Sequence, residues 1–246
     1  MPFLHMLNQH DVLSFKDPIV VIPIASIEAH GPLPLGFDIL FAECLLKILD
    51  THIDELLIVP PIPISTSYEH SECGPTATVT CTTFSSYLKE FLTSLSNYFS
   101  KFIVAVFHGG AYHCIYVAIR EILQSNRNIL IKIFNPYQTI SKYLEEIGLR
   151  NYIVHADPIE ASIALACNIN VGTITEVETI DDQVLKRYTV KVYSPWLCTD
   201  IADRYRSRTI VGSHNLGAKL LSLMIHDFIE LVKELRTLTN LTESTH

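Results

Sequence analysis

The sequence IVVIPIASIEAHGPLPLGFD (residues 19–38) contains the strongest structural pattern of the chain. Its first six residues are apolar and mostly β-branched, as in a strand that is covered on both faces. A turn-rich loop follows, and three of its side chains could bind a metal: Glu28, His30 and Asp38. Open α/β sheets bind ligands just beyond the carboxyl ends of such strands. The stretch therefore predicts a buried strand with a candidate metal site at its end.

The spacing within this loop favours convergence of the three side chains. Glu28 and His30 are two residues apart, so an extended backbone directs both to one side. The turn residues Gly31-Pro32 and Pro34-x-Gly36 can bring Asp38 back toward them. An ordinary polar surface loop is the alternative interpretation, because a motif as short as E-x-H often occurs by chance.

The rest of the chain alternates short apolar runs with amphipathic segments. These patterns predict strands at 19–24, 56–62, 102–107, 129–134 and 171–177. They predict helices at 39–49, 84–99, 112–124 and 216–235. They also predict a polar helix that follows the turn at 135–136 and runs to about 146, and a helix that opens within HADPIEAS (155–162) and runs to about 167. Such alternation predicts an α/β fold with three αβα layers and a mostly parallel central sheet. Between 181 and 208 the pattern weakens, and it predicts a strand or hairpin arm at YTVKVYSPW (188–196) within an extended surface loop.

Length and composition favour one domain over residues 1–246, with a frayed tail at about 237–246. The chain has 246 residues and 48% hydrophobic content, and it shows neither an internal repeat nor a low-complexity linker. With 18 basic and 26 acidic residues, its net charge is −8 and no basic run occurs, so we expect no nucleic-acid partner. No apolar window approaches the roughly 18 residues of a membrane span, so we expect no membrane partner.

The six cysteines are far apart and form no C-x-x-C pair. They occupy positions 44, 73, 81, 114, 167 and 198. This pattern indicates neither a zinc ribbon nor a thioredoxin-like site. We interpret them as mostly buried, reduced thiols. The N-terminus also lacks the basic and apolar regions of a signal peptide, so we predict a cytoplasmic protein.

Five segments of the chain resemble, in the same order, the sequence signatures of the creatininase family of amidohydrolases. They are EAHGPLPLGFD at 28–38, TSYEHSECGPTATV at 66–79, VFHGGA at 106–111, HADPIEAS at 155–162 and VGSHNLGAKLL at 211–221. The resemblance therefore covers nearly the whole chain. It implies a creatininase-like fold and a homo-oligomer, commonly a hexamer in this family.

The resemblance also implies a dinuclear metal site. The matching ligands are Glu28, His30, Asp38, His108 and Glu160, and they would hold two divalent ions bridged by Asp38. Carboxylates and imidazoles suit Zn, Mn or Fe without choosing among them. The reaction implied is hydrolysis of a non-peptide C–N bond in a small cyclic amide or formamide, by a hydroxide held between the metals.

Several of these residues have simpler interpretations. His108 precedes Gly109-Gly110, so it could be a turn residue, although those glycines would also leave space for metal and substrate. Glu160 lies near the start of a predicted helix, so it could simply be a helix-capping residue and not a metal ligand. Gly109, Gly110 and His155 are candidates for substrate binding.

The segment Tyr68, Glu69 and His70 supplies candidate catalytic residues, which would contact substrate or relay a proton. A polar loop at a subunit edge is the alternative. Arg204, Arg206 and Arg208 form the only basic cluster that could bind a phosphate, unless they are simply a solvated loop.

The chain departs from the family pattern at positions that affect function. The loop 28–38 lacks the family's second histidine, and Ala111 replaces an asparagine. Gly110 stands where creatininases carry a metal-binding glutamate, so creatinine is a poor substrate prediction. Glu160 completes the ligand set instead, as in archaeal formamidopyrimidine nucleotide deformylases of riboflavin and deazaflavin biosynthesis. The alternative is a non-catalytic creatininase-like protein that serves as a structural or binding subunit.

Overall fold

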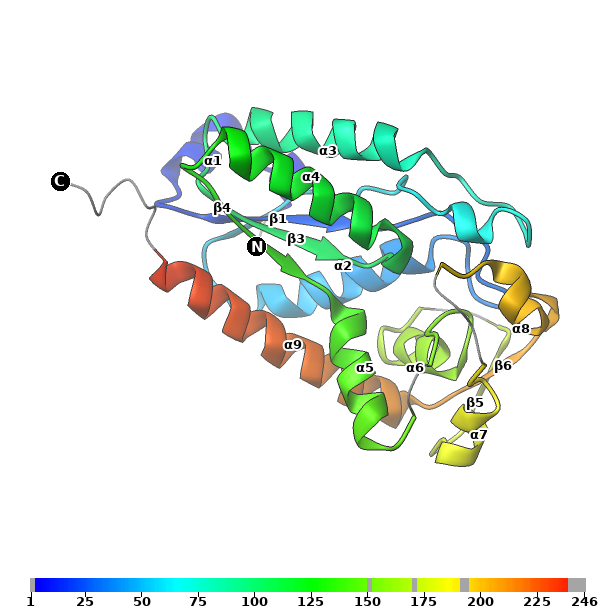
Figure 1. The fold of residues 1–246 in the computed structure, drawn as a ribbon. Coiled ribbons are helices and arrows are strands. Elements are labelled where there is room, and N and C mark those ends of the chain that lie inside the picture. Colours follow the sequence, from blue (N-terminus) through cyan, green and yellow to red (C-terminus); the bar gives the residue numbers. More distant parts are fainter. Residues whose placement is uncertain (1–2, 150–151, 170–171, 191–194, 239–246) are drawn as a thin grey trace.

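The computed structural model describes residues 3–149, 152–169, 172–190 and 195–238, and Figure 1 shows a central sheet between layers of helices. Four strands form this sheet in the order β2-β1-β3-β4. They are β1 (Ile19–Ile24), β2 (Leu56–Ile58), β3 (Lys101–Val106) and β4 (Leu130–Phe134). Each neighbouring pair is parallel. The predicted α/β architecture with a mostly parallel sheet is confirmed.

Strand β1 occupies an inner position of the sheet, and all six of its residues are buried. Ile19 is in register with Leu56 on one side and with Lys101 on the other. Successive side chains of a strand point to opposite faces, so Val20 and Val21 pack into different apolar clusters. This double coverage is the reason for the unbroken apolar run in the sequence.

Strand β2 is shorter than the strand predicted at 56–62. It pairs with β1 over three residues only, because Pro60 and Pro61 have no amide hydrogen to donate to the ladder. After these prolines, Ile62 returns to β1 through an isolated bridge with Ile24. The chain therefore stays beside β1 up to the point where the candidate metal loop begins.

Helices cover both faces of the sheet (Figure 1). One face carries α3 (Cys81–Leu95) and α4 (Tyr112–Ser125), and the other carries α2 (Phe37–Asp50) and α9 (His214–Thr237). The latter layer also contains α5 (Pro136–Glu146) and α6 (Pro158–Ala166). Before β1 the chain forms η1 (Leu4–Met6) and α1 (Gln9–Ser14).

Local hydrogen bonds decide where several helices begin. The helix predicted at 84–99 begins at Cys81, because the Thr80 side chain accepts a hydrogen bond from the amide of Thr83. Asn135 and Ser213 cap α5 and α9 in the same way. The other predicted helices agree with the structure to within about two residues.

The region 181–208 was wrongly predicted as mostly extended loop. It contains α7 (Asp182–Lys186), the 3-10 helix η4 (Cys198–Ile201) and α8 (Ala202–Arg206). Helices this short contain too few residues for an apolar period to be visible. Residues 191–194, the centre of the predicted hairpin arm, lie outside the described residues, as do residues 239–246 of the predicted tail.

A second, smaller sheet follows this region. Its two parallel strands are β5 (Ile174–Glu176) and β6 (Ile210–Gly212). The strand predicted at 171–177 contains β5, whereas β6 was not predicted. Three residues give no measurable alternation of apolar and polar side chains, so only the tertiary pairing identifies β6.

The prediction of reduced cysteines was wrong. All six lie in described segments and form the disulfides Cys44–Cys167, Cys73–Cys198 and Cys81–Cys114. Two of these join residues more than 120 positions apart, so no local spacing could reveal them. Disulfides are rare in the cytosol of most organisms, so the cysteines give no support to the predicted cytoplasmic location.

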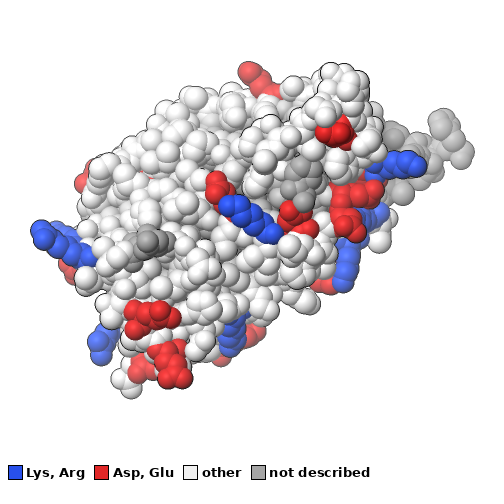
Figure 2. Space-filling model, turned by 180° about the vertical axis from the view of Figure 1, so that it is seen from behind, with Lys and Arg blue, Asp and Glu red and all other residues white. Residues whose placement is uncertain are grey.

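Two observations concern helix hydropathy and the distribution of charge on one face. None of the helices in the described ranges is both long and apolar enough to pass through a bilayer. On the face in Figure 2, basic side chains are interspersed with acidic ones.

The disulfides lead to a direct prediction. Purified protein unfolded in denaturant without reductant should show no thiols in a colorimetric titration, because all six sulfurs are paired. After reduction the same titration should detect six. Six thiols before reduction would instead restore the interpretation of a reduced protein.

Candidate metal centre

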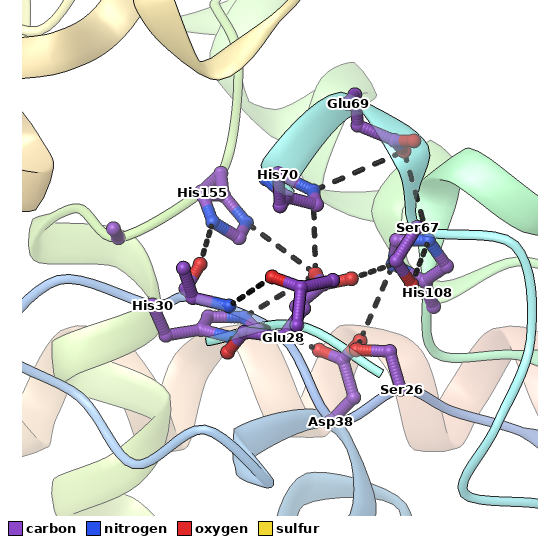
Figure 3. A network of polar contacts seen from close by, with 12 residues as sticks. Ser26, Glu28, His30, Asp38, Ser67, Glu69, His70, His108 and His155 are labelled. Carbon is purple, nitrogen blue, oxygen red and sulfur yellow. Dashed lines mark hydrogen bonds and ion pairs between the residues drawn. The ribbon is translucent and has the colours of Figure 1, made fainter. Parts of the chain in front are cut away.

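The five predicted metal ligands converge at the carboxyl ends of β1 and β3. Figure 3 shows most of this network, in which the loop after β1, the start of α2 and the end of β3 meet. The five side chains are almost fully buried: Glu28, His30, Asp38, His108 and Glu160. The parallel sheet therefore brings together residues from four separate segments of the chain.

Asp38 lies between two imidazoles. It is in the first turn of α2, and Ser26 donates a hydrogen bond of 2.9 Å to its Oδ2. The same Oδ2 is 3.5 Å from Nδ1 of His108, whereas Oδ1 is 3.6 Å from Nε2 of His30. One carboxylate thus faces two separate groups, which is the arrangement a bridging ligand needs.

Each of these two groups has further members. Glu28 approaches His108 on one side, with 3.0 Å between Oε2 and Nδ1. On the other side, Oε2 of Glu160 is 3.9 Å from Nε2 of His30. His155 also lies near this second group, since its ring centroid is 4.3 Å from that of His30.

Backbone carbonyls fix the protonation of three histidines. His108 contacts Thr66 O through Nε2 at 2.8 Å, and His155 contacts Ala29 O through Nε2 at 2.9 Å. Nδ1 of His30 lies 3.2 Å from the backbone carbonyl oxygen of Glu28. A carbonyl oxygen can only accept, so the contacting nitrogen carries the proton. In the neutral form of each ring the other nitrogen keeps a lone pair, as a metal ligand requires.

The lone pairs of these imidazole nitrogens face carboxylate oxygens. Two acceptor atoms of this kind repel each other unless a proton or a cation lies between them. Within this cluster, two buried atoms, Glu28 Oε2 and His30 Nε2, have no hydrogen-bond partner. Buried polar atoms are normally satisfied, so these two indicate a missing positive charge. The residues present therefore fit two divalent ions.

In the metal-free protein, protons supply part of this charge. Burial by itself lowers the pKa of His30, but Asp38 and Glu160 outweigh burial and raise this pKa to about 9. The pKa of His108 is likewise raised, because Glu28 and Asp38 overcome the effect of burial. A divalent ion would replace these protons, as metal binding at histidine generally does.

The structure distinguishes the two roles that the sequence left as alternatives for Glu160. It lies in the first turn of α6, and its Oε2 accepts a 2.7 Å hydrogen bond from the amide of Ala156. Asp157 is the residue that caps the helix, with bonds to the amides of Ile159 and Glu160. Glu160 is therefore not the cap itself, and burial raises its pKa to about 8.

The three predicted catalytic residues form the 3-10 helix η2 (Tyr68–His70) beside the ligand cluster. His70 is buried, with Nε2 at 3.4 Å from Glu28 Oε1, and burial lowers its pKa to about 4. Glu69 is partly exposed, and burial raises its pKa. Tyr68 is 67% exposed and lines the outer edge of the pocket.

The predicted substrate-binding residues line the same pocket, whose volume is about 690 Å³. Gly109 and Gly110 begin the 3-10 helix η3 (Gly109–Ala111) after β3. A Cβ at Gly110 would lie 1.6 Å from Glu69 Oε1, so only glycine leaves room for that carboxylate. His155 lies on the opposite side and stacks on His70 at 4.1 Å between centroids.

Of the two interpretations of the arginine cluster, the phosphate site in the pocket is not supported. Arg204 is buried, and its guanidinium donates to the carbonyls of Ile153 and His155. Arg206 is exposed and pairs with Asp203. None of the three arginines lines the pocket, so this cluster does not form a phosphate site there.

Sequence reasoning missed three aromatic residues of the site. Tyr137 places its hydroxyl 3.4 Å from both Asp38 Oδ1 and Glu160 Oε1. Its position directly after β4 could have revealed it, because strand ends carry the chemistry in such sheets. Trp196 and Tyr205 lie near His70 and come from the weakly patterned region, where no signal was available.

Comparison with known proteins gives a consistent result. A family model described as "Creatininase: Creatinine amidohydrolase" matches residues 5–232. No curated protein matches the sequence. A solved creatinine amidohydrolase (creatininase) aligns with a TM-score of 0.76 at 12% identity, over 96% of this chain and 98% of its own.

Two further structures carry metals in their names. A mutant creatininase of the Zn–Zn type has a TM-score of 0.72 at 12% identity, over 94% of this chain and 97% of its own. A structure named creatininase Mn has a TM-score of 0.68 at 14% identity, with the same coverage of 94% and 97%. At these identities the likeness establishes the fold alone.

The position of Asp38 between two groups predicts the effect of its removal. Asp38→Ala should lose both divalent ions, because a bridging carboxylate offsets the charge of both cations. Elemental analysis after dialysis would measure this, with circular dichroism to show that the variant folds. Glu43→Ala, on the exposed side of the same helix, is the matched control and should keep its metal. Full metal content in Asp38→Ala would contradict the site.

Proposed function

The chain belongs to the creatininase family of metal-dependent amidohydrolases, and from this premise we propose that it hydrolyses a non-peptide C–N bond of a small cyclic amide or formamide. The observation that carries this proposal is the position of the Asp38 carboxylate between His30 and His108, where buried acceptor atoms face one another. A site with this donor set is suited to two divalent ions and open toward a pocket of small-molecule size.

In this proposal, Glu28, His30, Asp38, His108 and Glu160 hold the ions. When bound, such a pair of ions lowers the pKa of water and polarises a carbonyl oxygen. The remaining steps belong to the protein. Ser26 and the backbone carbonyls of Glu28 and Thr66 keep Asp38, His30 and His108 in fixed orientations, which avoids reorganisation during the reaction.

Glu69 is the proposed proton carrier. Its raised pKa brings the carboxyl closer to neutral pH, where a group can both take up and release a proton. Its Oε1 lies 3.8 Å from Nε2 of His70 and 3.6 Å from Nε2 of His108, at the boundary between ligand cluster and pocket. We assign it the transfer of a proton to the leaving nitrogen.

His70 is proposed to contact the substrate as a neutral hydrogen-bonding group. Burial lowers its pKa to about 4, so the ring adds no charge at pH 7. A neutral imidazole can polarise a carbonyl without giving up its proton. Tyr68 and His155 complete the walls on either side.

The specific substrate proposed is a formamidopyrimidine nucleotide, on the sequence pattern of Gly110 and Glu160. Support for the formamide is stronger than support for the phosphate, because Arg204 binds backbone carbonyls in the interior. We also propose a homo-oligomer, which the family resemblance suggests.

The substrate prediction is formate release from a formylaminopyrimidine nucleotide by the metal-loaded protein, with little or no hydrolysis of creatinine. The physical reason is Gly110, which supplies no ligand of its own at this position. Formate and creatine production, measured side by side, would test it. Equal turnover of creatinine would refute the deformylase assignment. Failure with every amide at full metal content would favour a structural or binding subunit.

Glu69→Gln tests the proton carrier. This change keeps size and hydrogen bonding but removes the titrating proton, so kcat should fall by about 10²–10⁴-fold, the usual contribution of general acid–base catalysis. Glu72→Gln, an exposed glutamate just after η2, is the control and should keep full activity. Unchanged kcat in Glu69→Gln would remove Glu69 from the mechanism.

A further inference from the structure

The residues 195–206, here called the wall segment, join the active site through contacts that the function above does not use. The segment contains η4 and α8, and its Pro195, Trp196 and Leu197 line the pocket. Figure 1 places α8 at the same end of the molecule as the carboxyl ends of the strands. Its aromatic side chains lie near both His70 and His155, and the hydroxyl of Tyr205 contacts His70.

Three kinds of contact join the wall segment to the His70 region. The Tyr205 hydroxyl is 2.7 Å from Nδ1 of His70. The Trp196 ring meets the His70 ring edge-on, with 5.4 Å between centroids. The disulfide Cys73–Cys198 then links the segment covalently to the loop that follows His70.

The direction of the hydrogen bond between Tyr205 and His70 follows from the groups that face the other nitrogen of the His70 ring. Nε2 of His70 faces Glu28 Oε1 at 3.4 Å and Glu69 Oε1 at 3.8 Å. The ionised carboxylate of Glu28 only accepts hydrogen bonds, so the ring proton is favoured on Nε2. Nδ1 is then an acceptor, and the phenol of Tyr205 is the donor.

We propose that Tyr205 is a positioning residue, whose hydroxyl holds His70 in the tautomer that presents Nε2–H to the pocket. This role rests on the proposed function, in which His70 contacts the substrate. The hydrogen bond that one ring nitrogen of a histidine makes generally decides which of the two nitrogens carries the proton.

The backbone around Tyr205 is held in place from two directions. Its neighbour Arg204 donates to the carbonyls of Ile153 and His155, within the loop that leads into α6. The carbonyl oxygen of Arg204 would lie 2.5 Å from a Cβ at Gly31, so α8 packs directly against the metal loop. With the disulfide at Cys198, these contacts leave the Tyr205 ring little freedom to move away.

The test begins with Tyr205→Phe, which removes only the hydroxyl. On the formamide or cyclic amide that the wild-type protein turns over best, kcat should fall by about 10–100-fold, the usual cost of losing a group that orients a catalytic residue. KM should change less than kcat, and metal content should stay the same. Tyr143→Phe, whose ring packs against Lys219, is the control and should leave kcat unchanged.

A double-mutant cycle separates positioning from a general structural effect. In a His70→Gln background, Tyr205→Phe should lower kcat by less than about twofold, because its target is already gone. A full loss of kcat in that background would overturn the proposal. So would unchanged kcat in the single Tyr205→Phe variant.

A spectroscopic measurement keeps this test independent of the substrate. Nitrogen-15 chemical shifts of the histidine rings in zinc-loaded protein distinguish protonated from unprotonated nitrogens. His70 should show one tautomer, with the proton on Nε2, in the wild-type protein and in Tyr143→Phe, and a mixture in Tyr205→Phe. The same tautomer in all three would refute the positioning role. If no amide is hydrolysed but the tautomer shifts, the proposed function fails and the Tyr205 contact stands.

The disulfide is tested by comparing two cysteine pairs. Replacing Cys73 and Cys198 by alanine should reproduce the tautomer mixture of Tyr205→Phe, because Tyr205 is then less firmly held. Replacing Cys44 and Cys167, which join α2 to the end of α6, is the matched control and should leave His70 unaffected. Equal effects of the two pairs would overturn the role of the Cys73–Cys198 bond.

Discussion

The repulsion among buried carboxylates is the constraint on which this structure depends. Glu28, Asp38 and Glu160 lie almost fully buried around the same imidazoles, and burying such charges without compensation is very unfavourable. Histidine protons or divalent cations must therefore be present for the strand ends to keep this arrangement. Stability and function are coupled here, because the charge that binds metal is the charge that the fold must neutralise.

The fold meets this constraint with fixed backbone groups. Backbone carbonyls direct three imidazoles so that their lone pairs face inward, and the α6 entry directs Glu160 through the amide of Ala156. Ala156 adopts a φ of 48°, an uncommon value for a residue other than glycine. The strain at this residue is located where the chain must turn His155 and Glu160 toward the same centre.

The wall segment shows how a region without a sequence pattern can matter to the site. Its residues reach His70 through a hydroxyl and an aromatic edge, and a disulfide joins it to Cys73 after η2; these three contacts share no period along the chain. Arg204 illustrates the same point, because an arginine in a polar stretch suggests a surface cation. In the fold its guanidinium instead bonds carbonyls of the loop that carries His155.

The sequence by itself determined the parallel sheet and most helices, because strand burial and helical period are local and repeat along the chain. The ligands in the segments around Glu28, His108 and Glu160 were predicted from the resemblance of those segments, in order, to family signatures. Only the tertiary structure decided the cysteine pairing, the pairing of β6, the burial of Arg204 and the contact of Tyr205 with His70. Each of these depends on distance in space between residues far apart in sequence, and no local pattern encodes that distance.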